Sequence, residues 1–455
     1  MREADKFGTQ PLGKLLRQQA FPASIGILVM SIYGIVDTIF VGHFVGADGI
    51  GAITVVLPIT FLIASIGMAI GVGGASVLSR ALGDNNKEKA YFTFGNQVML
   101  TVTLALLFVL IGFVFSDEVI RLFGGNGSIH GPAMEYFGIV LIGIPFLAWS
   151  MMSNNVIRTE GYPKIAMIIM IIPAVLNVVL DPILIVYFDM GLAGAAWATT
   201  ISFVGSAMFA FYHFSLGKSQ LSFAAKYFIL KPMIIGEIAS LGAVTFARQG
   251  VISVLATVLN NSLFYYGGEQ GLSVYGIINR VLMFANFPVL GITQGFVPIV
   301  GYNFGAKFKN RVRDIVKLAI VWATAFALII FALLMIFAHE IPALFTKNTS
   351  LIENSGNAIR IVFLATPLLA VSLIISAYYQ AIGRALPALL LALTKQGFFL
   401  IPLVLILPLY FGLDGIWMAF PIADVGAALV SYIYYKVAKV RYSDKDVVRN
   451  PDIIQ

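Results

Sequence analysis

Twelve long apolar stretches, separated by short polar segments, set the limits on what this chain can fold into. A helix that crosses the hydrocarbon core of a bilayer needs about 20 mostly apolar residues, and each stretch meets that length. The sequence therefore predicts an all-α polytopic membrane protein with twelve transmembrane helices. The predicted spans are 17–41, 53–79, 93–115, 133–153, 165–187, 191–214, 233–259, 272–300, 315–338, 357–379, 385–409 and 412–435.

The composition excludes most other classes of protein. Of the 455 residues, 59% are hydrophobic and only 11% are charged, whereas soluble domains average about 25% charged residues. The net charge of +7 comes from basic residues that are spread over the loops, so they form no nucleic-acid-binding face. The chain contains no cysteine, which excludes thiol catalysis, disulfides and thiolate metal sites. We expect the lipid bilayer, and no nucleic acid, as a partner.

The basic residues predict how the chain is oriented in the membrane. Most lysines and arginines lie in the loops on one side of the predicted spans, and the opposite side carries only Arg121, Lys347 and Arg360. Because cytoplasmic loops hold the excess of basic residues, both termini are predicted to be cytoplasmic. The first ten residues, MREADKFGTQ, are polar and charged and do not resemble a signal peptide, so we expect this segment to be retained.

The second half of the chain repeats the first at an offset of about 222 residues. Each half holds six spans, so both halves enter the membrane in the same direction, which predicts two lobes related by a pseudo-twofold axis along the membrane normal. The predicted division is an N-lobe at 1–214, a cytoplasmic linker at 215–232, a C-lobe at 233–440 and a cytoplasmic tail at 441–455. The matched positions are Gly73 and Gly295, Gly83 and Gly305, Pro145 and Pro367, and Gly161 and Gly383.

Two carboxylates lie inside the predicted spans of the N-half, Asp37 and Asp181. An ionisable group in hydrocarbon costs at least ~2.5–3.5 kcal/mol on insertion scales, so it is a functional candidate. Asn177 precedes Asp181 by four residues and shares its helix face, and Thr199 adds a hydroxyl from the next span. Pro182 removes a backbone donor and predicts a kink. These groups predict a site for H+ or Na+; alternatively, either aspartate caps a helix break or satisfies a buried partner.

The C-half carries charges of a different character. The positions equivalent to Asp37 and Asp181 are Leu259 and Leu403, so we expect the cation site in the N-half alone. Asp424 could neutralise Lys395 or Arg280, since intramembrane charges usually pair. The residues that could line a substrate cleft or form a structural charge network are Tyr33, Arg248, Gln249, Arg280, Lys395 and Asp424.

No motif for a catalytic nucleophile, a zinc site or a phosphate-binding loop is present, so we expect no enzyme activity, no cofactor and no metal other than a coupling Na+.

Five segments together resemble the multidrug and toxic compound extrusion (MATE) transporters, in particular the prokaryotic DinF-like branch and its multidrug-exporting members. The resemblance covers nearly the whole chain. The segments are SIYGIVDTIFVGHFVG from residue 31, GVGGASVLSRALGDNN from 71, RTEGYPK from 158, NVVLDPILI from 177 and GFVPIVGYNFGAKF from 295.

This resemblance implies a two-lobed exporter of the prokaryotic inner membrane that moves lipophilic cations outward, coupled to inward flow of H+ or Na+. It also implies that Asp37, Asn177, Asp181 and Thr199 form the cation-coupling network, and we expect the protein to work as a monomer. A second reading is a flippase for a lipid-linked oligosaccharide, which the basic residues Arg248, Arg280 and Lys395 of the C-half keep open. A third is a membrane-embedded enzyme acting on lipids, for which the spans lack a nucleophile with its base.

Overall fold

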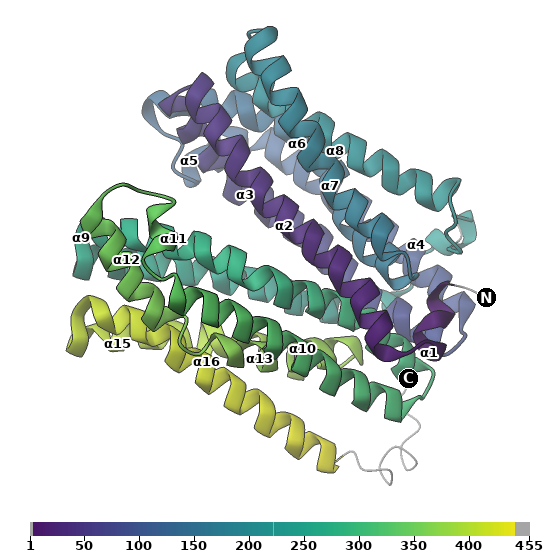
Figure 1. The fold of residues 1–455 in the computed structure, drawn as a ribbon. Coiled ribbons are helices and arrows are strands. Elements are labelled where there is room, and N and C mark those ends of the chain that lie inside the picture. Colours follow the sequence, from purple (N-terminus) through teal and green to yellow (C-terminus); the bar gives the residue numbers. More distant parts are fainter. Residues whose placement is uncertain (1–2, 222, 442–455) are drawn as a thin grey trace. The chain divides into compact units, whose positions relative to one another are not determined.

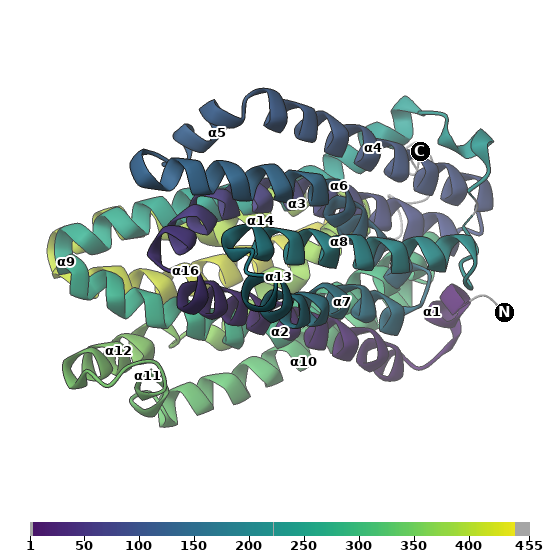
Figure 2. The ribbon, with the colours of Figure 1, turned by 90° about the horizontal axis from the view of Figure 1, so that it is seen from above.

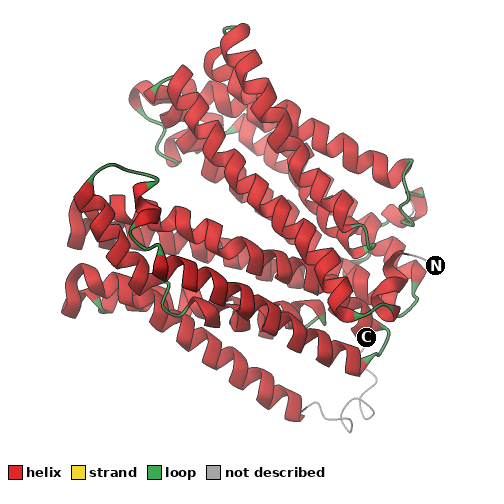
Figure 3. Ribbon diagram, viewed as in Figure 1, coloured by secondary structure: helices red, strands yellow, loops and turns green. Residues whose placement is uncertain are grey.

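The computed structural model describes residues 3–221 and 223–441, apart from the side chains of residues 35, 37–39, 47, 48 and 439–441. Figure 3 shows helices joined by loops, with no strand in this part of the chain. The predicted all-α fold is therefore confirmed for the described residues. Beyond Arg441, the predicted cytoplasmic tail lies outside them.

The chain forms two compact units. The first contains Met1–Phe246, Leu290–Ile315 and Ala381–Gly383, and the second contains Ala247–Val289, Val316–Gln380 and Arg384–Gln455. The long helix α9 contributes to both units, because its two ends belong to the first and its middle belongs to the second.

The first unit is built around long helices from the N-half of the chain. In Figure 1, α2, α3, α6, α7 and α8 run alongside one another, and Figure 2 shows α4 beside α6 from above. The elements are η1 (Glu3–Asp5), α1 (Lys6–Thr9), α2 (Leu12–Phe44), α3 (Ala47–Gly83), α4 (Lys87–Val114), α5 (Ser116–Leu122), η2 (Gly127–Ile129), α6 (His130–Thr159), α7 (Pro163–Asp181), η3 (Pro182–Tyr187), α8 (Gly191–Ser215), η4 (Ala225–Phe228) and the two ends of α9 (Pro232–Gly305).

The second unit packs the remaining helices around their own apolar core. Side chains from α9, α10, α12, α15 and α16 meet in this core, for example Leu259, Leu334, Ile359, Val404 and Phe420. The elements are most of α10 (Lys309–Ile336), α11 (Glu340–Ala343), α12 (Thr349–Val362), α13 (Thr366–Ala381) up to Gln380, α14 (Ala385–Leu393), η5 (Thr394–Leu400), α15 (Ile401–Ile406) and α16 (Pro408–Arg441).

The described helices give the predicted number of membrane crossings. Ten spans are long and apolar enough to cross a membrane, and the pair α12 and α13, bent by 51°, makes an eleventh. Among them α9 has 74 residues and counts as two crossings, because the chain reverses at Gly268, where φ is 58°. Leu263 and Val274, on either side of the reversal, share one core. The described part of the chain therefore contains twelve crossings.

One difference from the sequence prediction lies at this reversal. The sequence predicts a connection between 259 and 272, whereas the helix continues on both sides up to Gly268. The intervening residues contain no proline, so nothing interrupts the hydrogen-bonding pattern until a glycine adopts the left-handed conformation that reverses the chain.

Glycines bring α3 and α9 into direct backbone contact within the first unit. A Cβ atom on Gly83 would lie 2.0 Å from the carbonyl oxygen of Tyr302, and one on Gly305 would lie 2.1 Å from that of Arg80. Gly83 corresponds to Gly305 and Arg80 to Tyr302 at the 222-residue offset, so these are two copies of the same contact. The predicted repeat is therefore present in the packing as well as in the sequence.

A second pair of glycine contacts is also repeated at the 222-residue offset. A Cβ atom on Gly73 would lie 2.8 Å from the backbone nitrogen of Gly242, and one on Gly295 would lie 2.7 Å from that of Ala20. Gly242 and Ala20 are again equivalent positions. We call Gly73, Gly83, Gly295 and Gly305 the glycine seam.

An ion-paired group links α3 and α4 to the part of α9 that precedes Gly268. Glu237 Oε1 lies 2.8 Å from Arg80 Nη2, and Glu237 Oε2 lies 3.2 Å from the ammonium group of Lys89. These side chains retain partial exposure, so the pairs supplement the backbone contacts with a modest electrostatic contribution.

Substitution of Gly305 by alanine should lower the thermal stability of the purified protein by several degrees. The added methyl group has no space beside the carbonyl of Arg80, and overpacking of this kind costs about 1–3 kcal/mol. The measurement is a fluorescence-detected melting curve in detergent. Gly236→Ala is the matched control, because this glycine also lies on α9 with open space around it, and there alanine should be neutral or stabilising by ~0.5–1 kcal/mol. Equal losses in both variants would contradict the packing described for the seam.

Candidate functional site

The polar site of the N-half lies where α7 changes its helical geometry. The helix ends at Asp181, and the next six residues, Pro182–Tyr187, continue as the π-helix η3. Proline removes a backbone donor, so the regular pattern cannot continue, and π-helical turns are frequent at functional sites. The kink predicted at Pro182 is thus found as a π-helical segment. A Cβ atom on Gly194 would lie 2.8 Å from the carbonyl carbon of Leu184, which shows how closely α8 approaches η3.

Three of the predicted coupling residues meet in this site. Asn177, Asp181 and Thr199 expose 0%, 1% and 7% of their surface. In the amide orientation that satisfies both neighbours, the Asn177 nitrogen donates to Asp181 Oδ2 at 2.8 Å. The Asn177 oxygen then accepts from Thr199 Oγ1 at 3.2 Å and from the Thr199 backbone nitrogen at 3.3 Å. The amide therefore links the carboxylate on α7 to the hydroxyl on α8.

The arrangement suits a small cation by its chemistry. It offers one carboxylate, one amide and one hydroxyl inside an apolar bundle, and oxygen ligands are preferred by hard cations. A carboxylate held in such surroundings is costly to keep charged without a cation or proton nearby. Asp37 lies in α2, but its side chain is outside the described part, so its place in this site stays a prediction. Tyr33, also in α2, is partly buried.

In the second unit the structure selects one of two possible partners for Asp424. Lys395 Nζ lies 2.5 Å from Asp424 Oδ1. Arg280 instead lies over the ring of Phe345, with its guanidinium carbon 5.7 Å from the ring centre. The pair therefore forms between η5 and α16, and Arg280 makes a cation–π contact with a residue outside it.

The remaining predicted residues of the C-half are not part of this pair. Arg248 and Gln249 lie on α9, where Arg248 is partly buried and Gln249 is exposed. The backbone oxygen of Gln249 accepts from Ser253 Oγ at 3.2 Å.

Sequence reasoning missed a buried carboxylate at the end of α6. Glu160, 5% exposed, accepts from Ser219 Oγ at 2.8 Å and from the backbone nitrogen of Gln220 at 2.9 Å. His213 Nε2 lies 3.4 Å from the same carboxylate. The only available signal was the segment RTEGYPK, which holds Glu160 but does not reveal its partners. These contacts fix the start of the predicted linker against the helices of the first unit.

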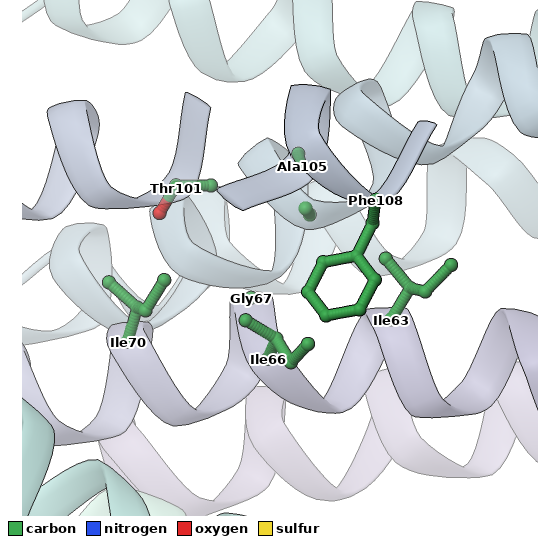
Figure 4. Close-up of a pocket in the computed structure, with 8 residues that line it drawn as sticks. Ile63, Ile66, Gly67, Ile70, Thr101, Ala105 and Phe108 are labelled. Atoms are coloured by element: carbon green, nitrogen blue, oxygen red, sulfur yellow. The ribbon is translucent and has the colours of Figure 1, made fainter. Parts of the chain in front are cut away.

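Figure 4 shows a narrow apolar hollow between α3, α4 and α6. Ile66, Ile70, Ala105 and Phe108 line it, and Thr101 supplies a hydroxyl. It is too narrow to admit a water molecule, so it is an imperfection of helix packing rather than a binding site. No group of histidine, aspartate and glutamate side chains in the described residues has the arrangement of a metal site.

Comparisons with known proteins agree with the repeat and with the fold. The MatE family profile matches residues 22–183 and 243–406, two segments that begin 221 residues apart. The chain is 28% identical over 427 residues to the multidrug export protein MepA of Staphylococcus aureus, which covers 94% of each protein.

Solved structures show the same architecture. A MATE transporter crystallised in complex with MaL6 superposes with a TM-score of 0.91 at 25% identity, covering 96% of this chain and 99% of that one. A transporter of the MOP superfamily from Pyrococcus furiosus gives a TM-score of 0.90 at 25% identity, with 96% and 98% coverage.

A double-mutant cycle should detect the link between Asn177 and Thr199. We expect the effects of Asn177→Ala and Thr199→Val on the free energy of unfolding to be non-additive by about 0.5–1.5 kcal/mol, because either change breaks the same contact. The control cycle pairs Asn177→Ala with Thr200→Val, since the Thr200 hydroxyl donates to Ile139 instead. Coupling of equal size in both cycles would show that the amide is not bonded to Thr199.

Proposed function

Because the chain belongs to the MatE family, we propose that it is a multidrug exporter that moves lipophilic cationic compounds out of the cell by antiport against H+ or Na+. The observation that carries this proposal is the buried carboxylate of Asp181, which accepts from Asn177, whose amide oxygen in turn accepts from Thr199. The name of the staphylococcal relative, a multidrug export protein, supports the substrate class.

The mechanism follows from competition for negative charge. When the site is open to the outside, H+ or Na+ loads Asp181, together with Asp37, and removes the charge that holds a cationic substrate. Binding of the coupling ion and of the substrate are therefore linked with opposite sign. Reopening toward the cytoplasm releases the ion and restores the carboxylate for the next substrate. Asn177 and Thr199 orient the carboxylate and supply neutral oxygen atoms when Na+ is the ion.

We also propose that the protein resides in a prokaryotic inner membrane, with both termini in the cytoplasm, and works as a monomer. The excess of basic residues in the loops on one side supports the orientation.

The alternative, a flippase for a lipid-linked oligosaccharide, is less well supported. A pyrophosphate group needs cations that are free to hold it. Lys395 is neutralised by Asp424, and Arg280 lies against an aromatic ring. Arg248 alone among the three basic residues has no such contact among those described.

Efflux of a fluorescent lipophilic cation from proteoliposomes tests the proposed function. Wild-type protein should transport under an imposed pH gradient or an imposed Na+ gradient, and the effective gradient identifies the ion. Asp181→Asn should lower the initial rate at least about tenfold, because asparagine cannot alternate between charged and neutral states and the coupling free energy of linked sites is typically 1–3 kcal/mol.

The matched control for this experiment is Asp189→Asn. Asp189 is exposed, lies eight residues further along, and has a φ of 54°, a conformation that asparagine also tolerates. It should transport as wild type does. Normal gradient-driven transport by Asp181→Asn would rule out the coupling role, and the absence of transport under either gradient in wild type would favour the flippase.

A further inference from the structure

The ion pair between Lys395 and Asp424 joins two membrane-spanning segments of the second unit. The Lys395 side chain is 17% exposed and that of Asp424 is 6% exposed. The helices that carry the pair also contribute to the apolar core of the second unit, with Leu400 from η5 and Phe420 and Ala423 from α16. Keeping two charges in such surroundings costs desolvation free energy that an apolar pair of side chains would avoid.

The pair joins the fifth and sixth spans of its half, as the coupling site does in the other half. Lys395 is the second residue of the π-helix η5, and the N-half site adjoins the π-helix η3 in the equivalent fifth span. In each half the partner comes from the sixth span, Thr199 in α8 and Asp424 in α16. The two halves therefore place polar groups between the same two helices.

When the halves are aligned at the 222-residue offset, the pair lies about one helical turn from the position equivalent to the N-half site. At 222 residues, Lys395 corresponds to Pro173, four residues before Asn177, and Asp424 corresponds to Ser202, three residues after Thr199. Both shifts are about one turn of 3.6 residues. Since the two helices are antiparallel neighbours, both shifts run toward the same, predicted cytoplasmic, ends. The pair is thus a displaced counterpart of the N-half site.

The charges of this counterpart define the ligand that it can hold. A ligand with only a positive charge would satisfy Asp424 but leave the ammonium of Lys395 without a counter-charge. A ligand with only a negative charge would satisfy Lys395 but leave the carboxylate of Asp424 without a counter-charge. A molecule that carries both an ammonium-like and a carboxylate group gives each side chain an opposite charge, so no buried charge is left alone.

We propose that Lys395 and Asp424 form a second substrate site, which accepts lipophilic zwitterions by inserting the ligand between the two charges. The proposal rests on the exporter function above and extends its substrate class from cations to zwitterions. The π-helix supports it, because a π-helical turn displaces the backbone around Lys395 from regular α-helical packing. The lysine side chain has a flexible four-carbon stem and can move aside, while Asp424 stays fixed in α16.

Two related dyes allow a direct test. Rhodamine B carries a cationic ring system and a carboxylate, whereas its ethyl ester has the same rings and only the positive charge. The measurement is the dissociation constant of each dye for purified protein in lipid nanodiscs, by fluorescence anisotropy. The decisive quantity is the ratio of the constant for rhodamine B to that for the ester, because general damage to the protein affects both dyes alike.

Single variants should move this ratio in opposite directions. Lys395→Gln should raise it at least about tenfold, since the dye carboxylate loses its cation while the ester gains an unmasked Asp424. Asp424→Asn should lower it by a similar factor, because the remaining ammonium repels the ester and attracts the carboxylate of rhodamine B. Arg280→Gln is the matched control, a cation of the same unit that contacts Phe345 instead, and it should leave the ratio within about twofold.

A purely structural ion pair gives a different result. Both single variants would then weaken both dyes together and leave the ratio unchanged, which would overturn the proposal. If a single variant does not fold, Lys395→Leu combined with Asp424→Leu removes both charges without leaving one unpaired. This double variant should raise the ratio at least about tenfold, and an unchanged ratio would again contradict the proposal.

The outcome is separable from that of the exporter proposal. If wild type binds neither dye and transports no lipophilic cation, the exporter function is wrong. If wild type binds and exports the ester but the ratio does not respond to Lys395 or Asp424, only the zwitterion site is wrong.

Discussion

The contact on which the first unit depends is the approach of two helix backbones at glycine. At Gly83 and Gly305 the carbonyl oxygens of Tyr302 and Arg80 occupy the space where a Cβ atom would be. In a bilayer the lipid chains are as apolar as the side chains, so helix association relies on close packing rather than on removal of apolar surface from water. Using the same glycine contact twice, once from each half of the repeat, fixes α3 and the last part of α9 in matched positions.

The polar sites follow from a second constraint, the scarcity of hydrogen-bond partners in hydrocarbon. Asp181 is 1% exposed within its span, so Asn177 supplies a hydrogen bond to its carboxylate, and Thr199 in turn donates to Asn177. The change from α to π geometry at Pro182 occurs directly beside this group. Irregular backbone is tolerated at membrane depth where protein surrounds it, and here α8 covers it through the glycine contact at Gly194.

Much of this arrangement was predictable from local spacing. Asn177 and Asp181 share a face because they are four residues apart, and the long apolar stretches predict the twelve crossings.

Contacts between distant segments were not predictable in this way. The charges of Lys395, Arg280 and Asp424 allowed two pairings, and only the packing of η5 against α16 selects Lys395. Glu160 likewise finds its partners about 60 residues along the chain, a distance that periodicity does not address. The helix that continues to Gly268 also differs from the predicted loop, because Asn260 and Asn261, which follow the predicted span, do not end a helix when no proline interrupts its bonds.

The two halves also differ in how they balance charge, and this difference separates their roles. In the described side chains of the N-half site, a carboxylate is held by neutral groups, so a mobile cation or proton changes its net charge. In the C-half the carboxylate of Asp424 is already paired with the ammonium group of Lys395, so a proton or Na+ has no unbalanced charge to bind. Under the two proposals above, an ion gradient acts on the N-half, and the Lys395 and Asp424 pair responds to the charge pattern of the transported molecule. If both proposals hold, divergence of a repeated helix pair gives one fold an energy-coupling site and a selectivity site without an added domain.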